Sequence, residues 1–443
     1  MEIQPFRAFR FDEKVVGDVG SCIAPPYDVI SPAQQHQLYR KSKYNIVRVT
    51  KGRTTPFDNN SNNQYTRAAD YFNTWIKKGV LKQDLTDAIY AYVQDFQLAD
   101  KQFPQGNRSF QRSSFISLAK LEPLGKTVRP HEQTFDEPKI DRLNLKRATV
   151  AKFGLVFMLY EDQKGIADKI VKKSLWQKPV IDFLDEQGVR HRIFAITDKH
   201  DIDAIAKMMR DKTCIIADGH HRYETALNYY KETANPFAAY QMIAFVNTCR
   251  DGLIILATHR LVKNLEHFDI KELLTALKQS FKITEYRFDS PQSKIDAEQK
   301  MLAKMKAEYH NDKNAFGIYG GNNAFYTTVL IDNQAMDSLV PNMSPAWRSL
   351  DVSVLHKLVF ERLLGIREWQ LAEGSNIEYV KDTETAIDGS IAKVDTGEIQ
   401  AAFFLNAAKM KQIENVTSAG EKMPQKSTYF YPKMYTGLTI NKL

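Results

Sequence analysis

The stretch CIIADGHHRYETAL, residues 214–227, decides the fold class. Its first four residues form a short apolar run, which Asp218 and Gly219 interrupt as a tight turn. After the turn, apolar residues recur at the spacing of a helix, at Tyr223, Ala226, Leu227 and Tyr230. The stretch therefore predicts a strand, a turn and a helix in succession.

Strand and helix patterns alternate on both sides of this stretch. Strands are predicted at 88–96, 114–121, 154–160 and 192–196, and helices after Pro32, at 64–78 and at 202–209. From residue 268 the pattern becomes helix, hairpin, helix and strand, with a loop at 320–323 and a helix at 352–364. The predicted class is α/β, with an α+β C-terminal domain.

Length and composition restrict the architecture. A chain of 443 residues has room for roughly two to four domains. With 43% apolar and 26% charged residues it is typical of a folded protein, and it has neither a run of about 18 apolar residues nor an N-terminal signal segment. We expect a cytoplasmic protein without a membrane span, made of an N-terminal extension (1–85), a core (86–265) and a C-terminal domain (266–443).

Cysteine content and charge indicate which ligands and metal sites the protein can have. The three cysteines, Cys22, Cys214 and Cys249, match no metal-binding spacing and predict free thiols. The net charge of +8 is dispersed, which favours a small anionic ligand at least as much as DNA. No phosphate loop, zinc-protease helix or dinucleotide fingerprint is present, so no dedicated metal site is expected.

The turn at residues 218–222 is the strongest candidate site. Asp218, Gly219, His220, His221 and Arg222 place a carboxylate, two imidazoles and a guanidinium at a helix N-terminus, where anions are favoured. Adjacent histidines on a helix diverge by roughly 100°, so they suit different parts of one ligand better than one metal. The alternative is structural: Asp218 caps the helix and the histidines lie on its surface.

Two further clusters carry polar chemistry. The polar stretch 126–147 is predicted as a loop, in which Glu132, beside His131, is a carboxylate able to accept a proton from a hydroxyl; the alternative is a solvated loop. Near the C-terminus, Lys426, Ser427 and Thr428 offer one cation and two hydroxyls to a phosphate. The alternative there is an aromatic strand with incidental hydroxyls.

Four segments together resemble the domain of unknown function 1015 family (DUF1015) over essentially the whole chain: APPYDVIS, RPHEQT, IADGHHRYETAL and GEKMPQKSTYFYPK. The order HEQ, DGHHR and KST is similar to that of the free L-serine kinases of the ParB/sulfiredoxin-like superfamily. This resemblance implies a ParB/sulfiredoxin-like catalytic core, with the site in the cleft between the core and the C-terminal domain. In those kinases one branch uses ADP and yields AMP with O-phospho-L-serine, and another uses ATP; the present sequence resembles the ADP branch more.

The resemblance also implies roles for individual residues. Glu132, next to His131, corresponds to the catalytic base, and the DGHHR motif from Asp218 to Arg222 corresponds to the group that handles the nucleotide phosphates and helps in transfer. Lys426, Ser427 and Thr428 correspond to contacts with the serine phosphate, although Tyr429 and Phe430 replace the basic residue and histidine of the kinases. Tyr27 and Asp28, in the N-terminal extension, are further candidates.

The expected function is therefore a cytoplasmic phosphotransferase acting on free serine, or the reverse reaction on phosphoserine. Its ligands would be serine or phosphoserine with ADP or ATP, with AMP as product or co-substrate, and Mg²⁺. Neither a membrane nor a specific nucleic acid is expected as partner. Two alternatives stay open: a ParB-like nucleotide-dependent switch associated with DNA, for which no convincing helix-turn-helix is found, and a catalytically silent nucleotide- or phosphate-binding protein.

Overall fold

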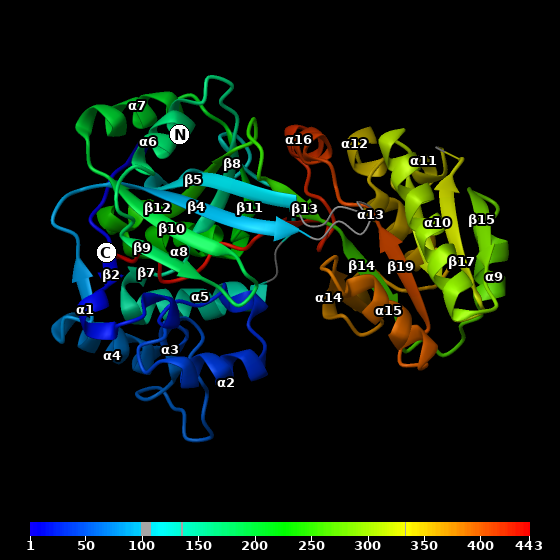
Figure 1. Ribbon diagram of the computed structural model, residues 1–443, viewed down its shortest axis with the longest axis horizontal. Helices are drawn as coiled ribbons and strands as arrows, with labels where there is room; N and C mark the ends of the chain where they lie inside the picture. The colour runs from blue at the N-terminus through cyan, green and yellow to red at the C-terminus, as the bar shows by residue number, and fades with distance from the viewer. Residues whose placement is uncertain (99–107, 134–135, 333) are drawn as a thin grey trace. The chain divides into compact units, whose positions relative to one another are not determined.

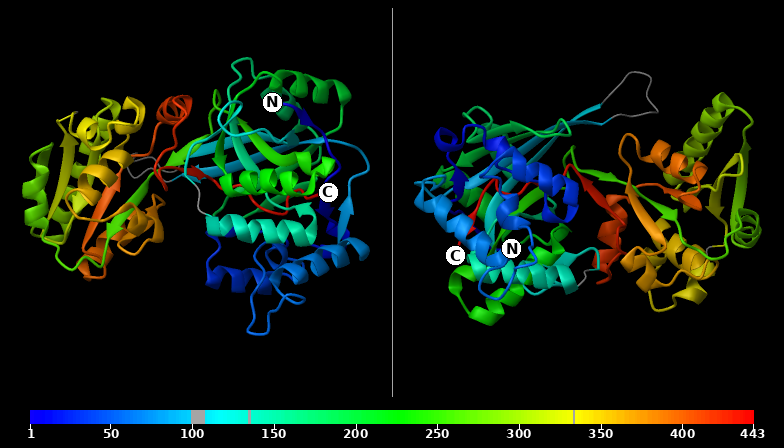
Figure 2. Two further views of the ribbon diagram at one scale, coloured as in Figure 1. Left: turned by 180° about the vertical axis from the view of Figure 1, so that it is seen from behind. Right: turned by 90° about the horizontal axis from the view of Figure 1, so that it is seen from below.

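The computed structural model describes residues 1–98, 108–133, 136–332 and 334–443. The chain divides into two compact units. The first contains Met1–Pro130, Thr134–Ile254 and Pro432–Leu443, and the second contains His131–Gln133 and Ile255–Tyr431. Both ends of the chain thus belong to the first unit (Figure 2). The three-part division at residues 85 and 265 stays a prediction.

The first unit is built on a nine-stranded mixed sheet (Figure 1). In spatial order its strands are β6 (Val128–Pro130), β11 (Cys214–Asp218), β8 (Val156–Tyr160), β12 (Tyr240–Asn247), β5 (Arg108–Lys120), β4 (Ile89–Leu98), β10 (Arg190–Ile196) and β9 (Ile181–Leu184), with β1 (Ile3–Gln4) beside β5. Strand β11 pairs parallel to β6 and antiparallel to β8. Two small ribbons complete the strands of this unit: β2 (Phe9–Phe11) with β3 (Leu81–Gln83), and β7 (Ala151–Lys152) with β21 (Asn441–Lys442).

Helices cover both faces of this sheet. Figure 1 shows α6 and α7 on one face and α8 with α5 on the other. The helices are α1 (Glu13–Val16), α2 (Pro32–Lys41), α3 (Val47–Thr50), α4 (Gln64–Lys77), α5 (Asp136–Thr149), α6 (Ile166–Ser174), α7 (Lys199–Met209) and α8 (His220–Thr233), with short 3₁₀ turns at Val19–Ser21, Tyr27–Val29 and Pro236–Ala239. The buried apolar residues of the sheet pack against α6, α7 and α8, whereas a second apolar cluster joins α2, α3 and α4 to α5.

The second unit has a six-stranded sheet, in which every described pairing is antiparallel. Its strands, in order, are β15 (Phe281–Arg287), β17 (Ala324–Leu330), β16 (Ala315–Tyr319), β19 (Ala401–Leu405), β14 (Thr258–Val262) and β18 (Ile377–Lys381). A further pair joins β13 (Ile254–Leu256), which begins at the last residue of the first unit, to β20 (Tyr429–Tyr431). The helices are α9 (Ile270–Leu277), α10 (Pro291–His310), α11 (Ala335–Leu339), α12 (Pro345–Arg348), α13 (Asp351–Val354), a π-helical continuation (Leu355–Glu361), α14 (Glu368–Glu373), α15 (Ala386–Asp395) and α16 (Met410–Ser418).

The mixed α/β class is confirmed, and so is the strand, turn and helix of residues 214–227, as β11 and α8. The loop predicted across residues 126–147 is wrong at two places, because β6 occupies Val128–Pro130 and α5 begins at Asp136. Pro138 is compatible with this helix because a proline in the first turn removes no intrahelical hydrogen bond.

No helix of the described residues is long and apolar enough to cross a membrane. The three cysteines are free thiols, two of them buried.

Candidate functional site

Asp218 and Gly219 connect β11 to α8 in the first unit. Gly219 has a φ of +85°, in the left-handed region that favours glycine. A Cβ atom at this position would also lie 3.3 Å from the Cα atom of Val156. Glycine therefore allows the end of the strand to turn directly into the first residue of the helix.

The Asp218 carboxylate is held by a lysine from the end of the chain. Lys433 Nζ donates to Asp218 Oδ1 at 2.6 Å, and the side chains are 13% and 15% exposed, respectively. Burial alone would raise the pKa of Asp218, but the charges of Lys433 and Arg222 hold that pKa well below its ordinary value. Because no side chain caps α8 at Gly219 in the described chain, the alternative role of Asp218 as a helix cap is wrong.

Arg222 brings the N-terminal extension to this turn. Its Nη1 donates to the carbonyl oxygen of Leu155, and its Nη2 lies 3.6 Å from Asp28 Oδ1. The guanidinium carbon also lies 5.7 Å from the centre of the Tyr27 ring. The structure therefore gathers Tyr27 and Asp28, the two further candidates of the sequence analysis, with Arg222 and Asp218 in the first unit.

The chemistry of this set is that of an anion site. His220 and His221 are half-buried in the first turn of α8, and the positive end of a helix dipole adds to the charge of Arg222. Lys433 supplies a second cation, although it is already paired with Asp218. These groups suit the positioning and charge neutralisation that phosphoryl transfer requires.

His131 and Glu132 belong to the second unit. The segment is fixed by backbone pairing, since Met423 N donates to the carbonyl oxygen of His131 at 2.7 Å. The Glu132 carboxylate accepts hydrogen bonds from both the backbone N–H and the hydroxyl of Thr428, each at 3.0 Å. Two of the predicted clusters, 296 residues apart, are thus one local structure.

His131 completes this group. Its Nε2 lies 2.7 Å from Thr428 Oγ1, and its side chain is 1% exposed. Because the Thr428 hydroxyl donates to Glu132, its oxygen is available to accept from His131, which places a hydrogen on Nε2. The hydrogen bonds from His131 to Thr428 and from Thr428 to Glu132 fix the orientation of the carboxylate.

Lys426 and Ser427 precede Thr428 but point to different partners. The carbonyl oxygen of Lys426 accepts from Nη2 of Arg260 at 2.9 Å, and the Ser427 hydroxyl donates to the carbonyl oxygen of Pro424. The Lys426 side chain is exposed, whereas Ser427 lines a cavity of about 310 Å³ within the second unit. The described contacts therefore do not gather the Lys426 ammonium and the two hydroxyls around one point.

Arg260 and Lys433 are the residues that sequence reasoning missed. Arg260 is 1% exposed, and burial lowers its pKa to about 10, an effect that the Glu132 charge opposes. In the sequence Arg260 is a single arginine within a strand pattern, and nothing there indicates that it is buried near Glu132. Lys433 belonged to the quoted segment GEKMPQKSTYFYPK, but nothing in that segment indicated a partner 215 residues away.

The described residues do not form a magnesium site at this turn. The one group of three potential ligands among them is Asp198, His200 and Asp201, at the start of α7, where Asp198 already caps the helix. Asp218 is occupied by Lys433, and its neighbours in the turn are basic.

A family model described as "Protein of unknown function (DUF1015)" matches residues 3–353. No curated protein matches. Among solved structures, a free serine kinase in complex with AMP is 13% identical, with a TM-score of 0.33; the match covers 71% of this chain and 86% of that one.

Two other solved structures have the same TM-score of 0.33. A conserved hypothetical protein from Pyrococcus furiosus is 14% identical over 72% of this chain and 92% of its own. SbnI from Staphylococcus aureus, with a C-terminal truncation, is 10% identical over 74% of this chain and 87% of its own.

Replacing Lys433 by methionine should destabilise the first unit by about 3 kcal/mol, because it leaves the Asp218 carboxylate without its closest cation. Denaturant unfolding of Lys433→Met, Asp218→Asn and the double variant measures this. We expect the double variant to lose less stability than the sum of the single losses. Strictly additive losses would contradict the ion pair.

A second prediction concerns Asp351, which lines the cavity of the second unit and accepts a hydrogen bond from Asn314. Burial raises its pKa to about 7, above the unfolded value, so its protonation stabilises the fold at low pH and this contribution is lost as pH rises through 7. Asp351→Asn should therefore stabilise the protein by about 1–3 kcal/mol at pH 8 and by less at pH 5. Calorimetric unfolding at both pH values, with exposed Asp296→Asn as control, tests this; a gain independent of pH would contradict it.

Proposed function

The chain belongs to the DUF1015 family, and from that premise we propose that it is a phosphotransferase acting on the hydroxyl of free L-serine. The serine oxygen attacks the terminal phosphorus of a nucleotide, and the new O–P bond forms as the bond to the leaving phosphate oxygen breaks. With ADP the products are AMP and O-phospho-L-serine, and with ATP the nucleotide product is ADP. The reverse direction uses the same groups.

The pairing of Glu132 with Thr428 carries the proposal. The HEQ and KST motifs of the resembling kinases correspond to a base and to contacts with the serine phosphate, and here their counterparts share two hydrogen bonds. In this proposal Glu132 takes the proton of the serine hydroxyl, and Thr428 with His131 orients the carboxylate. His131 acts as a positioning residue because its hydrogen bond goes to Thr428.

The second part of the proposal concerns binding of the nucleotide, which we assign to the turn of the first unit. Gly219, His220, His221 and Arg222 bind the nucleotide phosphates at the N-terminus of α8, and Lys433 keeps the Asp218 carboxylate ionised and in place. Tyr27 and Asp28 orient Arg222 through their contacts with the guanidinium. The exposed ammonium of Lys426 and the hydroxyl of Ser427 are proposed as substrate contacts on the resemblance alone.

Glu132→Gln should lower kcat by about 10² to 10⁴-fold while leaving nucleotide affinity nearly unchanged, because the amide cannot accept the proton yet preserves the shape of the side chain. Formation of O-phosphoserine from serine and a panel of nucleotides, followed by phosphorus NMR, measures the rate. Glu373→Gln, an exposed substitution in the same unit, is the matched control. Equal turnover of Glu132→Gln and the parent protein would refute the assignment of the base.

Arg222→Ala and His220→Ala should each weaken ADP and ATP binding, the arginine change by at least about tenfold, because each removes a donor from the proposed phosphate site. Isothermal titration calorimetry measures the dissociation constants, with exposed Arg40→Ala as control. If both variants bind nucleotide as the parent does, the turn has a structural role only.

A further inference from the structure

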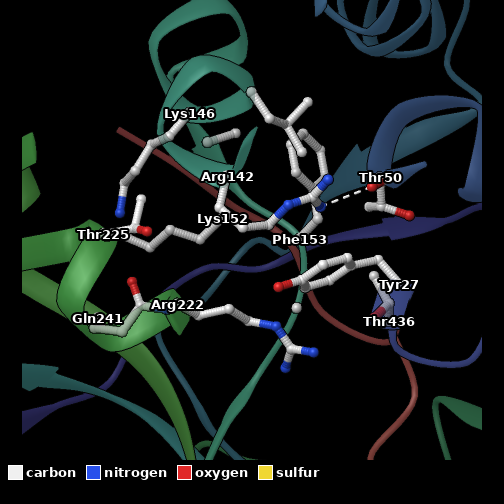
Figure 3. Close-up of a pocket in the computed structure, with 13 residues that line it drawn as sticks. Tyr27, Thr50, Arg142, Lys146, Lys152, Phe153, Arg222, Thr225, Gln241 and Thr436 are labelled. Carbon is white, nitrogen blue, oxygen red and sulfur yellow. Dashed lines mark hydrogen bonds between the residues drawn. The ribbon is translucent and has the colours of Figure 1, made fainter. Parts of the chain in front are cut away.

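A cavity of about 70 Å³ lies inside the first unit, next to the turn but lined mainly by other residues (Figure 3). Its polar lining comes from α5, α8, β7, β12 and the N- and C-terminal segments, and it includes Tyr27, Arg142, Lys146, Lys152, Arg222 and Gln241. Four of these are basic, and none of the described lining residues is acidic. The remaining lining is apolar, with Leu145, Ala151 and Phe153.

Lys146 is the group in this cavity that most requires a ligand. Its side chain is 93% buried, yet no described residue offers its ammonium a hydrogen bond or a carboxylate, and its one described contact is the Tyr229 ring, 5.6 Å away. Burial lowers its pKa to about 7. An isolated charge in such a place is costly to the fold unless an opposite charge compensates it.

Lys152 is a second buried lysine without a carboxylate partner among the described residues. It is 4% exposed and donates to the side-chain oxygen of Asn441 at 2.7 Å, but no carboxylate of the described chain pairs with it. Burial, reinforced by the charge of Lys146, lowers the pKa of Lys152 well below its ordinary value. The two amines therefore repel one another when both are protonated, and a bound anion would favour the protonated form of both.

The two arginines differ because each already has a carboxylate partner outside the cavity. Arg142 pairs with Asp141 and lies 3.9 Å from the centre of the Tyr27 ring, and Arg222 lies near Asp28. In Figure 3 the Tyr27 ring points its hydroxyl toward the middle of the labelled side chains. The lining thus combines two lysines that have no carboxylate partner in the described chain with neutral donors.

We propose that this cavity binds a tetrahedral oxyanion, either inorganic phosphate or the terminal phosphate of a phosphate ester, with Lys146 and Lys152 as its charged partners. The volume of about 70 Å³ is sufficient for the five non-hydrogen atoms of phosphate. The bound dianion supplies the missing counter-charge, and Tyr27 and Gln241 supply hydrogen bonds. This inference stands whether or not the protein transfers phosphoryl groups to serine.

The test is titration of the full-length protein with sodium phosphate, against sodium chloride at equal ionic strength, by calorimetry and by thermal unfolding. Phosphate should bind and raise the unfolding temperature of the parent protein. Lys146→Met and Lys152→Met should each weaken phosphate binding by at least about tenfold. Lys146→Met should also unfold at a higher temperature than the parent without phosphate, because it removes an uncompensated buried charge.

Lys172→Met, an exposed substitution in the same unit, is the control and should bind phosphate like the parent. Competition with ADP identifies the source of the oxyanion: displacement of phosphate by ADP indicates the terminal phosphate of a nucleotide, and independent binding indicates free phosphate. Phosphate binding no stronger than that of chloride, or equal affinity in the parent and both cavity variants, would overturn the proposal. Neither result depends on whether serine is phosphorylated.

Discussion

The ion pair between Asp218 and Lys433 is the interaction on which the candidate phosphate site depends. A carboxylate at the end of β11, beside the N-terminus of α8, is stable there only with a cation against it. That cation comes from residues 432–443, which return to the first unit after the whole of the second has been completed. Arg112, itself 1% exposed, fixes this return by donating to the carbonyl oxygen of Pro432.

The structure contains two polar clusters, one at the Asp218 turn of the first unit and one around Glu132 in the second unit. Each is formed by residues that are far apart in the chain. In the first unit the set is rich in cations, which suits phosphate groups, and the carboxylate within it is neutralised by Lys433. In the second unit Glu132 is oriented by Thr428, with buried Arg260 contributing positive charge. One set therefore has the character of an anion site, and the other that of an oriented carboxylate.

The sequence predicted the elements with regular apolar patterns, such as β11, α8 and α4, because their inward faces are apolar. It failed at α5, where Arg142, Lys146 and Thr149 occupy inward positions at helical spacing, so the periodic signal was absent. It identified Asp218, Glu132 and Thr428 as chemically important but gave no indication of their partners. Lys433, Arg260 and Tyr27 acquire their roles from tertiary contacts, which no local pattern encodes.

The local sequence pattern did not predict the buried lysines of the cavity. Lys146 and Lys152 would be taken for surface residues from composition, and their burial is what distinguishes the cavity from an ordinary basic surface. A fold that retains uncompensated ammonium groups sacrifices stability at that place. Such a cost is typical of sites that acquire their counter-charge from a ligand.

The most direct test of phosphoryl transfer is to follow radioactive phosphate in the reverse direction. Purified protein is incubated with O-[³²P]phosphoserine and either AMP or ADP, with Mg²⁺, and the labelled products are separated. The account predicts that label appears in ADP or ATP, respectively, and that Glu132→Gln slows its appearance. Label that stays in phosphoserine, or that appears only as inorganic phosphate, would contradict the account.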